Sequence, residues 1–201
     1  MFIKRKNILI KEIIICSFFF LIIEGCDIFS TRDEELPEEG RANFQVATTI
    51  DILIQNFTNS LADKNTQNYI ACFSSPTFTN VNFSFIPSAE AVSQFPSLAN
   101  DWTLKNEEQY LNNVISKINS DSPIRLTLTN MELSPQGDSG TYSANYFLFV
   151  PHNDVSIPKD FEGGLNFSLI RDSRNVWTIS KWQDIKFEGK SSWSELKGMF
   201  Y

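Results

Sequence analysis

Few residues in this sequence carry side chains suited to nucleophilic catalysis or to metal binding. His152 is the only histidine, and it lies in the segment 150–154, whose composition is typical of a loop. A histidine-rich zinc site is therefore excluded, and a Ser-His-Asp triad would need His152 beside a nucleophile-elbow sequence that the chain lacks. We expect His152 to be an exposed loop residue. The sequence also has no phosphate-binding loop and no dinucleotide fingerprint, so neither a metal nor a cofactor is expected.

The first 25 residues have the layout of a secretory signal. Basic residues precede an apolar run over 13–23, which is too short for a bilayer core that takes ~20 residues but fits the apolar part of a signal peptide. The sequence Ile23-Glu24-Gly25-Cys26 resembles the cleavage and lipidation box of bacterial lipoproteins. Ile23, Gly25 and Cys26 match that pattern, and Glu24 departs from it. The alternatives are an uncleaved anchor and an ordinary cleaved signal.

The lipoprotein resemblance implies a covalent membrane anchor at Cys26. Two or more acyl chains, such as palmitate, contribute ~0.8 kcal/mol per buried methylene, which makes the attachment effectively permanent. The positive flank of the signal favours the cytoplasmic side, so we expect the rest of the chain to be exported. The predicted location is the bacterial cell envelope, on the inner or the outer membrane, facing away from the cytoplasm.

The composition of the mature chain limits the classes of partner that it can bind. Residues 26–201 carry 13 basic and 22 acidic residues, a net charge of −9. Nucleic acids and anionic lipid surfaces require a basic footprint, so no nucleic-acid partner is expected. With Cys16 in the signal and Cys26 lipidated, Cys72 is the one free thiol, which excludes an internal disulfide. Its apolar helical context indicates a small buried residue rather than a nucleophile.

Three segments divide the chain: a signal peptide over 1–25, an acidic flexible tether over 26–43, and one domain over 44–201. The tether is rich in acidic residues and holds too little apolar surface to fold. A calcium site among its acids is the alternative, but the ligand spacing of a calcium loop is absent.

Within the domain, the apolar spacing changes from helical to strand-like near Pro123. Helices are predicted over 50–61, 66–73 and 103–118, with a strand over 81–85 between the second and the third. Four further strands are predicted over 124–133, 141–150, 163–170 and 176–186. The strand over 141–150 is apolar on nearly both faces, which favours the centre of a covered sheet. Every glycine after Pro123 is interpreted as a turn residue, and 192–198 as one helical turn closed by Gly198.

This order of elements resembles the NTF2-like superfamily of α+β cone folds, which includes SnoaL-like and ketosteroid-isomerase-like domains. The resemblance covers about 44–187, and its most telling pieces are the helix pair running into Cys72-Phe73-Ser74-Ser75 and the last strand over 176–184. It implies N-terminal helices packed on a strongly curved antiparallel sheet, with a conical pocket between them. Members include enzymes and purely binding or dimerising domains, and the fold does not choose among them.

The resemblance also implies a chemistry in which a carboxylate moves a proton and a tyrosine or acid stabilises an enolate. Asp184 and three tyrosines could reach such a pocket: Tyr69, Tyr142 and Tyr146. The alternative, which we favour, is that the tyrosines are core rings and that Asp184 marks the solvated end of the last strand. No residue is therefore assigned a catalytic role.

The preferred function is a membrane-anchored, non-enzymatic binding or interaction domain with a small apolar pocket. Its partner would be a small apolar ligand or an envelope protein, and a homodimer through the sheet face is a further option. Two alternatives stay open: a pocket enzyme of the isomerase or dehydratase type, and a structural accessory subunit of an envelope assembly. A pocket lined by Phe, Leu and Ile alone would favour binding, whereas a buried carboxylate facing a tyrosine hydroxyl would favour the enzyme.

Overall fold

The computed structural model describes residues 43–201. The predicted signal peptide, Cys26 and nearly all of the predicted tether lie outside the described residues. The helices are α2 (Ile50–Ala62), α3 (Thr66–Ala71), α4 (Ala89–Gln94), the 3-10 helix η2 (Pro96–Ala99), α5 (Leu104–Ile115) and α6 (Trp193–Phe200). The strands are β1 (Ser84–Ile86), β2 (Arg125–Gln136), β3 (Ser139–Phe149), β4 (Asp160–Arg171) and β5 (Trp177–Lys186). None of the helices in this part of the chain is long and apolar enough to cross a bilayer.

Local sequence signals explain where the first helix begins and ends. The Thr49 hydroxyl accepts a hydrogen bond from the Ile52 amide at 3.3 Å, which caps one of the free N–H groups of α2. The helix ends at Ala62 with Asp63 as its C-cap, and the following Lys64 has a positive φ of 53° that breaks the helical path. Between these ends, Leu53 and Phe57 lie on the buried face, as helical spacing predicts.

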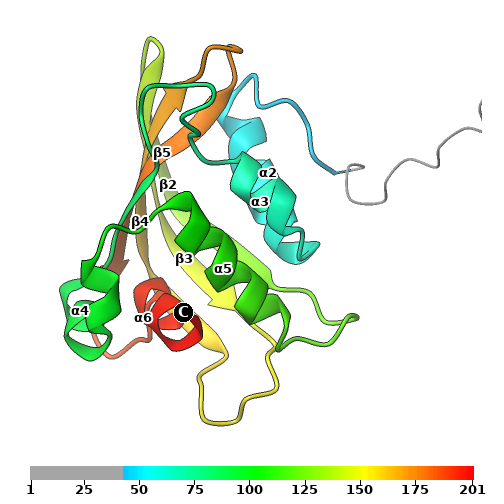
Figure 1. The fold of residues 1–201 in the computed structure, drawn as a ribbon, viewed down its shortest axis with the longest axis vertical. Helices are drawn as coiled ribbons and strands as arrows, with labels where there is room; N and C mark the ends of the chain where they lie inside the picture. Colours follow the sequence, from blue (N-terminus) through cyan, green and yellow to red (C-terminus); the bar gives the residue numbers. More distant parts are fainter. Residues whose placement is uncertain (1–42) are drawn as a thin grey trace, which may run out of the picture. The chain divides into compact units, whose positions relative to one another are not determined.

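The strands form a single sheet in the order β1-β5-β4-β3-β2, with the helices packed mainly on one of its faces (Figure 1). The four long strands are antiparallel neighbours, which confirms the α+β fold with an antiparallel sheet. The short β1 is parallel to β5, with Phe85 opposite Trp182. It therefore extends the sheet at the end opposite β2.

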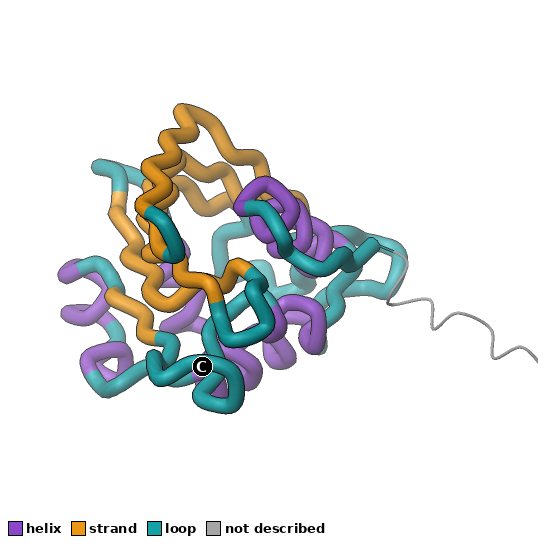
Figure 2. The backbone as a smooth tube through the Cα atoms, turned by 90° about the horizontal axis from the view of Figure 1, so that it is seen from above, coloured by secondary structure: helices purple, strands orange, loops and turns teal. Residues whose placement is uncertain are grey.

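The sheet bends around the helices (Figure 2). Its pairing register shifts twice, between Thr129 and Glu132 in β2 and between Ser168 and Leu169 in β4. Such bulges bend a strand and increase its twist. Gly163 lets the Tyr146 side chain lie close against the backbone of β4. A β carbon at position 163 would lie 2.6 Å from the Tyr146 hydroxyl oxygen. Gly163 lies inside β4 and is not the turn residue that its sequence context predicts.

Aromatic rings build the core between the sheet and the helices. Phe57 of α2 is fully buried, and its ring centroid lies 5.4 Å from that of Phe167 and 5.8 Å from that of Trp182. Trp182 in turn lies 4.6 Å from Trp193 of α6 in an edge-to-face arrangement. Such pairs add about 0.5–1.5 kcal/mol each beyond their buried area.

The prediction that β3 lies in the centre of a covered sheet is wrong. β4 is the middle strand, and the outward-facing Phe147 of β3 is 40% exposed. Helices cover only one face of the sheet at this position, so the apolar residues of the other face meet solvent.

The C-terminal segment is a helix inserted into the core and is longer than the single helical turn that its sequence predicts. The Ser192 hydroxyl accepts from the Glu195 amide at 3.3 Å, and the Glu195 carboxylate accepts from the Ser192 amide at 2.6 Å. This capping box starts α6, which then runs through Gly198 instead of ending there. Gly198 is needed for packing, since a β carbon would lie 2.3 Å from Cγ of Phe95.

Candidate functional site

A buried ion pair joins α5 to α6. Lys197 Nζ lies 2.5 Å from Glu107 Oε2, and both side chains are fully buried. The Tyr69 hydroxyl donates to Glu107 Oε1 and the Trp102 indole N–H donates to Oε2, each at 2.5 Å. Both carboxylate oxygens are therefore hydrogen-bonded, as a charge removed from water requires.

Aromatic rings surround the ammonium group of Lys197. The distances from Nζ to the ring centroids are 3.6 Å for Phe85, 4.0 Å for Trp182, 5.3 Å for Trp102 and 5.5 Å for Tyr110. Ring faces attract a cation, and this attraction strengthens where water is excluded. Burial nevertheless lowers the pKa of Lys197 to about 8, and the carboxylate of Glu107 opposes that shift only in part.

The second buried carboxylate, Asp184, also bonds to α6. Its Oδ1 accepts from the Tyr146 hydroxyl at 2.8 Å, and its Oδ2 accepts from the Ser194 amide at 2.8 Å and from the Ser194 hydroxyl at 2.5 Å. Asp184 is 3% exposed, so the prediction of a solvated strand end is wrong. The first turn of α6 covers it, and burial raises its pKa above the usual range for aspartate.

The structure joins some of the four candidate residues and separates others. Tyr146 contacts Asp184 and also accepts a hydrogen bond from the Trp193 amide at 2.7 Å. Tyr69 bonds to Glu107 on the α5 side instead. Tyr142 lies apart, and its buried hydroxyl has no hydrogen-bond partner among the described residues. Burial is the main cause that raises the pKa of each of these tyrosines.

The buried carboxylate–tyrosine pair that would favour an enzyme is therefore present, but it does not face a described cavity. The oxygens of Asp184 are bonded to Tyr146 and to Ser194 of α6, and the oxygens of Glu107 are bonded to Tyr69, Trp102 and Lys197. Lys197 thus provides the positive charge that pairs with the Glu107 carboxylate on the inner side of the sheet. In this arrangement the polar groups of the interior hold α6 in place.

His152 and Cys72 are both buried, which corrects one expectation and confirms the other. His152 is 0% exposed, with Nε2 2.9 Å from the Pro158 carbonyl oxygen and its ring 5.5 Å from that of Phe200. The loop folds back over it, so the prediction of an exposed histidine is wrong. Cys72 is 1% exposed, and burial raises the pKa of its thiol, as expected for a structural residue.

Sequence reasoning missed Glu107 and Lys197, the two charged residues at the centre of the interior. Glu107 lies in the first turn of α5 and Lys197 in the last turn of α6, positions where such charges are ordinary at a surface. One signal was available. Ser192 and Glu195 have capping-box spacing, which predicts a genuine helix with several apolar residues after it.

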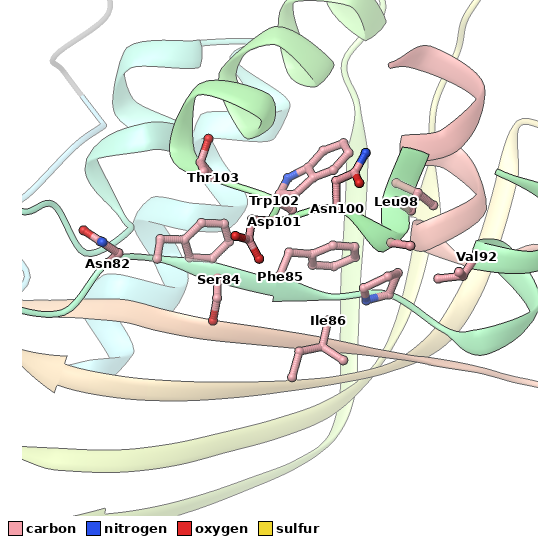
Figure 3. Close-up of a pocket in the computed structure, with 13 residues that line it drawn as sticks. Asn82, Ser84, Phe85, Ile86, Val92, Leu98, Asn100, Asp101, Trp102 and Thr103 are labelled. Atoms are coloured by element: carbon pink, nitrogen blue, oxygen red, sulfur yellow. The ribbon is translucent and has the colours of Figure 1, made fainter. Parts of the chain in front are cut away.

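The larger of the described cavities lies elsewhere, along β1. We call it the edge groove; it has a volume of about 570 Å³ and is lined by residues 82–87, Val92 and 98–103. Its apolar wall includes Phe85 and Trp102, and Ser84 and Ile86 point to the opposite side of the β1 backbone (Figure 3). The edge groove therefore runs from the strand to the loop between η2 and α5.

The edge groove offers shape and apolar surface rather than reactive groups. Asp101 is the only charged residue among those that line it, and neither Asp184 nor Glu107 contributes to its wall. Two of its aromatic residues, Phe85 and Trp102, also contact the buried Lys197–Glu107 pair. These contacts hold the groove wall in place. Within residues 43–201 there is also no group of three acidic, histidine or cysteine side chains that could hold a metal ion.

Comparisons with known proteins report on the fold. No protein-family model and no curated protein matches this sequence. Among solved structures, a candidate dehydratase from the NTF2-like family of Streptomyces avermitilis has a TM-score of 0.53 at 9% identity, over 69% of this chain and 93% of that one. An NTF2-like protein of unknown function from Pseudomonas putida has a TM-score of 0.51 at 11% identity, over 73% of this chain and 92% of that one.

A candidate scytalone dehydratase from Novosphingobium aromaticivorans has a TM-score of 0.51 at 7% identity, over 72% of this chain and 90% of that one. Identities this low report on the fold and leave activity open. The described part of this chain therefore has the NTF2-like fold, with helices packed on a curved, mainly antiparallel sheet.

Proposed function

We propose that this protein is a non-enzymatic binding module of the bacterial cell envelope, anchored through lipid at Cys26, that takes an apolar partner in the edge groove. One observation carries the proposal. The buried carboxylates of Glu107 and Asp184 are bonded to the chain's own α6, whereas the larger described cavity is lined mainly by aromatic and aliphatic side chains, with Asp101 as its one charged residue.

The interior is poorly suited to substrate chemistry in this arrangement. A general base must lie within hydrogen-bond reach of the proton that it removes. Asp184 already accepts three hydrogen bonds, two of them from Ser194, and Glu107 accepts three. An isomerase or dehydratase would require α6 to leave, which would expose Trp193, Leu196 and Lys197 that are now fully buried.

The edge groove has the features of a recognition surface. Apolar walls with a few polar groups are typical of binding pockets. Phe83, Phe85 and Trp102 provide rings, and Asn82, Asn100 and Thr103 provide polar groups. Ile86 lines the groove from the other side of the β1 backbone and is 41% exposed, so an apolar partner that lies along the edge of β1 could cover it.

The anchoring part of the proposal rests on the sequence between Ile23 and Cys26. A lipid at Cys26, followed by the acidic tether, would hold the domain near a membrane while leaving it free to meet partners. The net charge of −9 for residues 26–201 would keep the tether and domain off an anionic lipid surface.

The test of the binding site uses an apolar fluorescent probe and two matched variants. N-phenyl-1-naphthylamine is titrated into the full chain, into Ile86→Asp and into Ile185→Asp. The two isoleucines are equally exposed, 41% and 40%, but Ile185 lies on β5 outside the groove. Covering the exposed part of the Ile86 side chain contributes about 0.6–1.2 kcal/mol. An aspartate there would also have to lose water on binding, so Ile86→Asp is expected to weaken binding by ~10-fold or more.

Ile185→Asp is expected to bind the probe like the parent. Equal weakening by both substitutions would place binding outside the groove, and failure of the parent to bind would count against an apolar site. Far-ultraviolet circular dichroism and the melting temperature of each variant show that the comparison is made on folded protein.

A further inference from the structure

The edge groove lies along an unpaired strand edge. β1 is the end strand of the sheet and pairs only with β5. Consecutive residues 82–87 all line the groove. Alternate residues of a strand point to opposite faces, so a cavity lined by every residue in turn must run along the edge rather than against one face.

The backbone at this edge has no partner within the described part of the chain. No backbone hydrogen bond joins residues 83–87 to the facing loop 98–103. The N–H and C=O groups of β1 that point away from β5 are thus available beside an apolar cavity. Exposed edges of this kind add a further strand readily.

We propose that the edge groove binds an extended peptide segment of a partner protein, which adds to β1 as a sixth strand of the sheet. The proposal deepens the function proposed above and rests on it. Backbone hydrogen bonds would supply affinity, and the apolar walls around Phe85 and Leu98 would receive alternate side chains of the peptide. Pro87 follows β1 directly, so the added strand would be short, about three to five residues.

The two edges of the sheet differ in a way that favours β1 as the acceptor. The far edge strand, β2, carries the charges of Arg125 and Glu132 and a bulge between Thr129 and Glu132. Charges and bulges are the usual protection of an edge against pairing. β1 is Ser84-Phe85-Ile86, with neither a charge nor a bulge.

The negative charge of the chain and of its groove favours a different protein, rather than a second copy of this chain, as the occupant of the groove. Asp101 is exposed at the groove, and joining two copies through β1 would bring the two Asp101 carboxylates to one interface. Residues 26–201 also carry a net charge of −9, so two copies repel each other. A peptide with a lysine or arginine near Asp101 and apolar residues beside it is the complementary partner.

The experiment pans a phage-displayed library of random seven-residue peptides against the full chain. Enriched peptides are synthesised, and their affinity is measured by fluorescence anisotropy. Each peptide is also made with single backbone N-methyl groups at successive positions. Strand addition predicts that methylation weakens binding by ~10-fold at alternate positions and little between them, because only alternate N–H groups face β1.

Two charge-matched variants locate the site. Asp101→Lys is expected to weaken the enriched basic peptides by about 2–10-fold, the range for an exposed ion pair turned into a repulsion. Glu132→Lys makes the same change of sign on the other edge of the sheet and is expected to have no effect. Equal effects of the two variants, or N-methylation that is neutral at every position, would overturn strand addition.

The remaining outcomes separate this inference from the binding function on which it rests. If no peptide is enriched over bare support while N-phenyl-1-naphthylamine still binds in the Ile86-dependent way, strand addition is wrong and the apolar site stands. If the full chain sediments as a dimer that Asp101→Lys strengthens, the occupant is a second copy and the proposed partner is wrong. If neither peptide nor probe binds, both proposals fail.

Discussion

Lys197 Nζ and Glu107 Oε2 lie 2.5 Å apart, between two helices and with no exposed side-chain surface. The two residues are ninety positions apart in the chain. Their pairing fixes α6 against α5 and places a cation among the rings of Phe85 and Trp182. A helix held by such a pair is part of the core rather than an appendage of it.

Removing one member of this pair is expected to be far more harmful than removing both. Glu107→Gln or Lys197→Met alone leaves a buried charge without its partner, which costs about 3–5 kcal/mol. The double variant exchanges two charges for neutral groups and is expected to lie within about 1–2 kcal/mol of the parent. Urea unfolding of the parent, the two single variants and the double variant gives a double-mutant cycle. Additive single effects would contradict a direct coupling between the two side chains.

The depressed pKa of Lys197 predicts a particular dependence of stability on pH. Its pKa is about 8 in the folded chain and 10.5 in the unfolded one, so between these values the unfolded chain binds more protons. Lys197 therefore contributes a rise in the free energy of unfolding of about 1–2 kcal/mol from pH 8 to 9.5. Cys72 and the buried tyrosines, whose pKa values are raised in the folded chain, contribute in the opposite direction. The measurement is urea unfolding of the parent and of Lys197→Met at several pH values. The variant keeps the opposing contributions, so the difference between the two free energies of unfolding is expected to change by this amount. Parallel curves for parent and variant would contradict the shift. Cys72 and the tyrosines begin to lose protons in the unfolded chain within this window, and both proteins share that loss.

Two tyrosines of β3 provide a matched test of the Asp184 interactions. The Tyr146 hydroxyl donates to Asp184 and accepts from the Trp193 amide, whereas the Tyr142 hydroxyl has no partner among the described residues. Tyr146→Phe leaves Asp184 with one donor fewer and is expected to lower the free energy of unfolding by about 1–3 kcal/mol. Tyr142→Phe is expected to change it by less than ~0.5 kcal/mol. Equal losses of unfolding free energy in the two variants, measured by thermal unfolding, would show that the hydrogen bonds of Tyr146 do not stabilise the fold.

Gly198 is expected to resist replacement although it lies inside a helix. Alanine is favoured over glycine there by ~1 kcal/mol in intrinsic propensity. The new methyl group would meet the Phe95 ring at 2.3 Å, and overpacking of this kind costs about 1–3 kcal/mol. Gly198→Ala should therefore lower the melting temperature. Combining it with Phe95→Ala removes the clash, so the penalty of the alanine should disappear in that background. A penalty that persists there would point to another cause.

The lipid anchor at Cys26 is tested by labelling. Cys26→Ser is expected to lose both membrane association and incorporation of radiolabelled palmitate, because no other thiol lies in the predicted lipidation box. Cys72→Ser is the matched control and should retain both, since Cys72 is buried in the folded domain. Fractionation of cells that express each variant gives the answer, and equal labelling of Cys26→Ser and the parent would refute lipidation.

Much of the fold follows from short-range sequence patterns. Helical spacing and the Thr49 cap predict α2, and alternation predicts the four long strands. Asn175, with a φ of 64°, allows the turn between β4 and β5 at the predicted position. These features depend on residues a few positions apart, and for that reason they can be read from the sequence without knowledge of what packs against them.

Only the tertiary structure decided what lies inside the domain and what forms its groove. The path of α6 into the core buries Lys197 against Glu107 and covers Asp184, and the path of a loop buries His152. The parallel pairing of β1 with β5 leaves an unpaired edge beside residues 98–103. Each of these results depends on contacts between segments far apart in the chain. The pattern of apolar residues predicts that a segment will be buried, but it does not predict which other segment of the chain will pack against it.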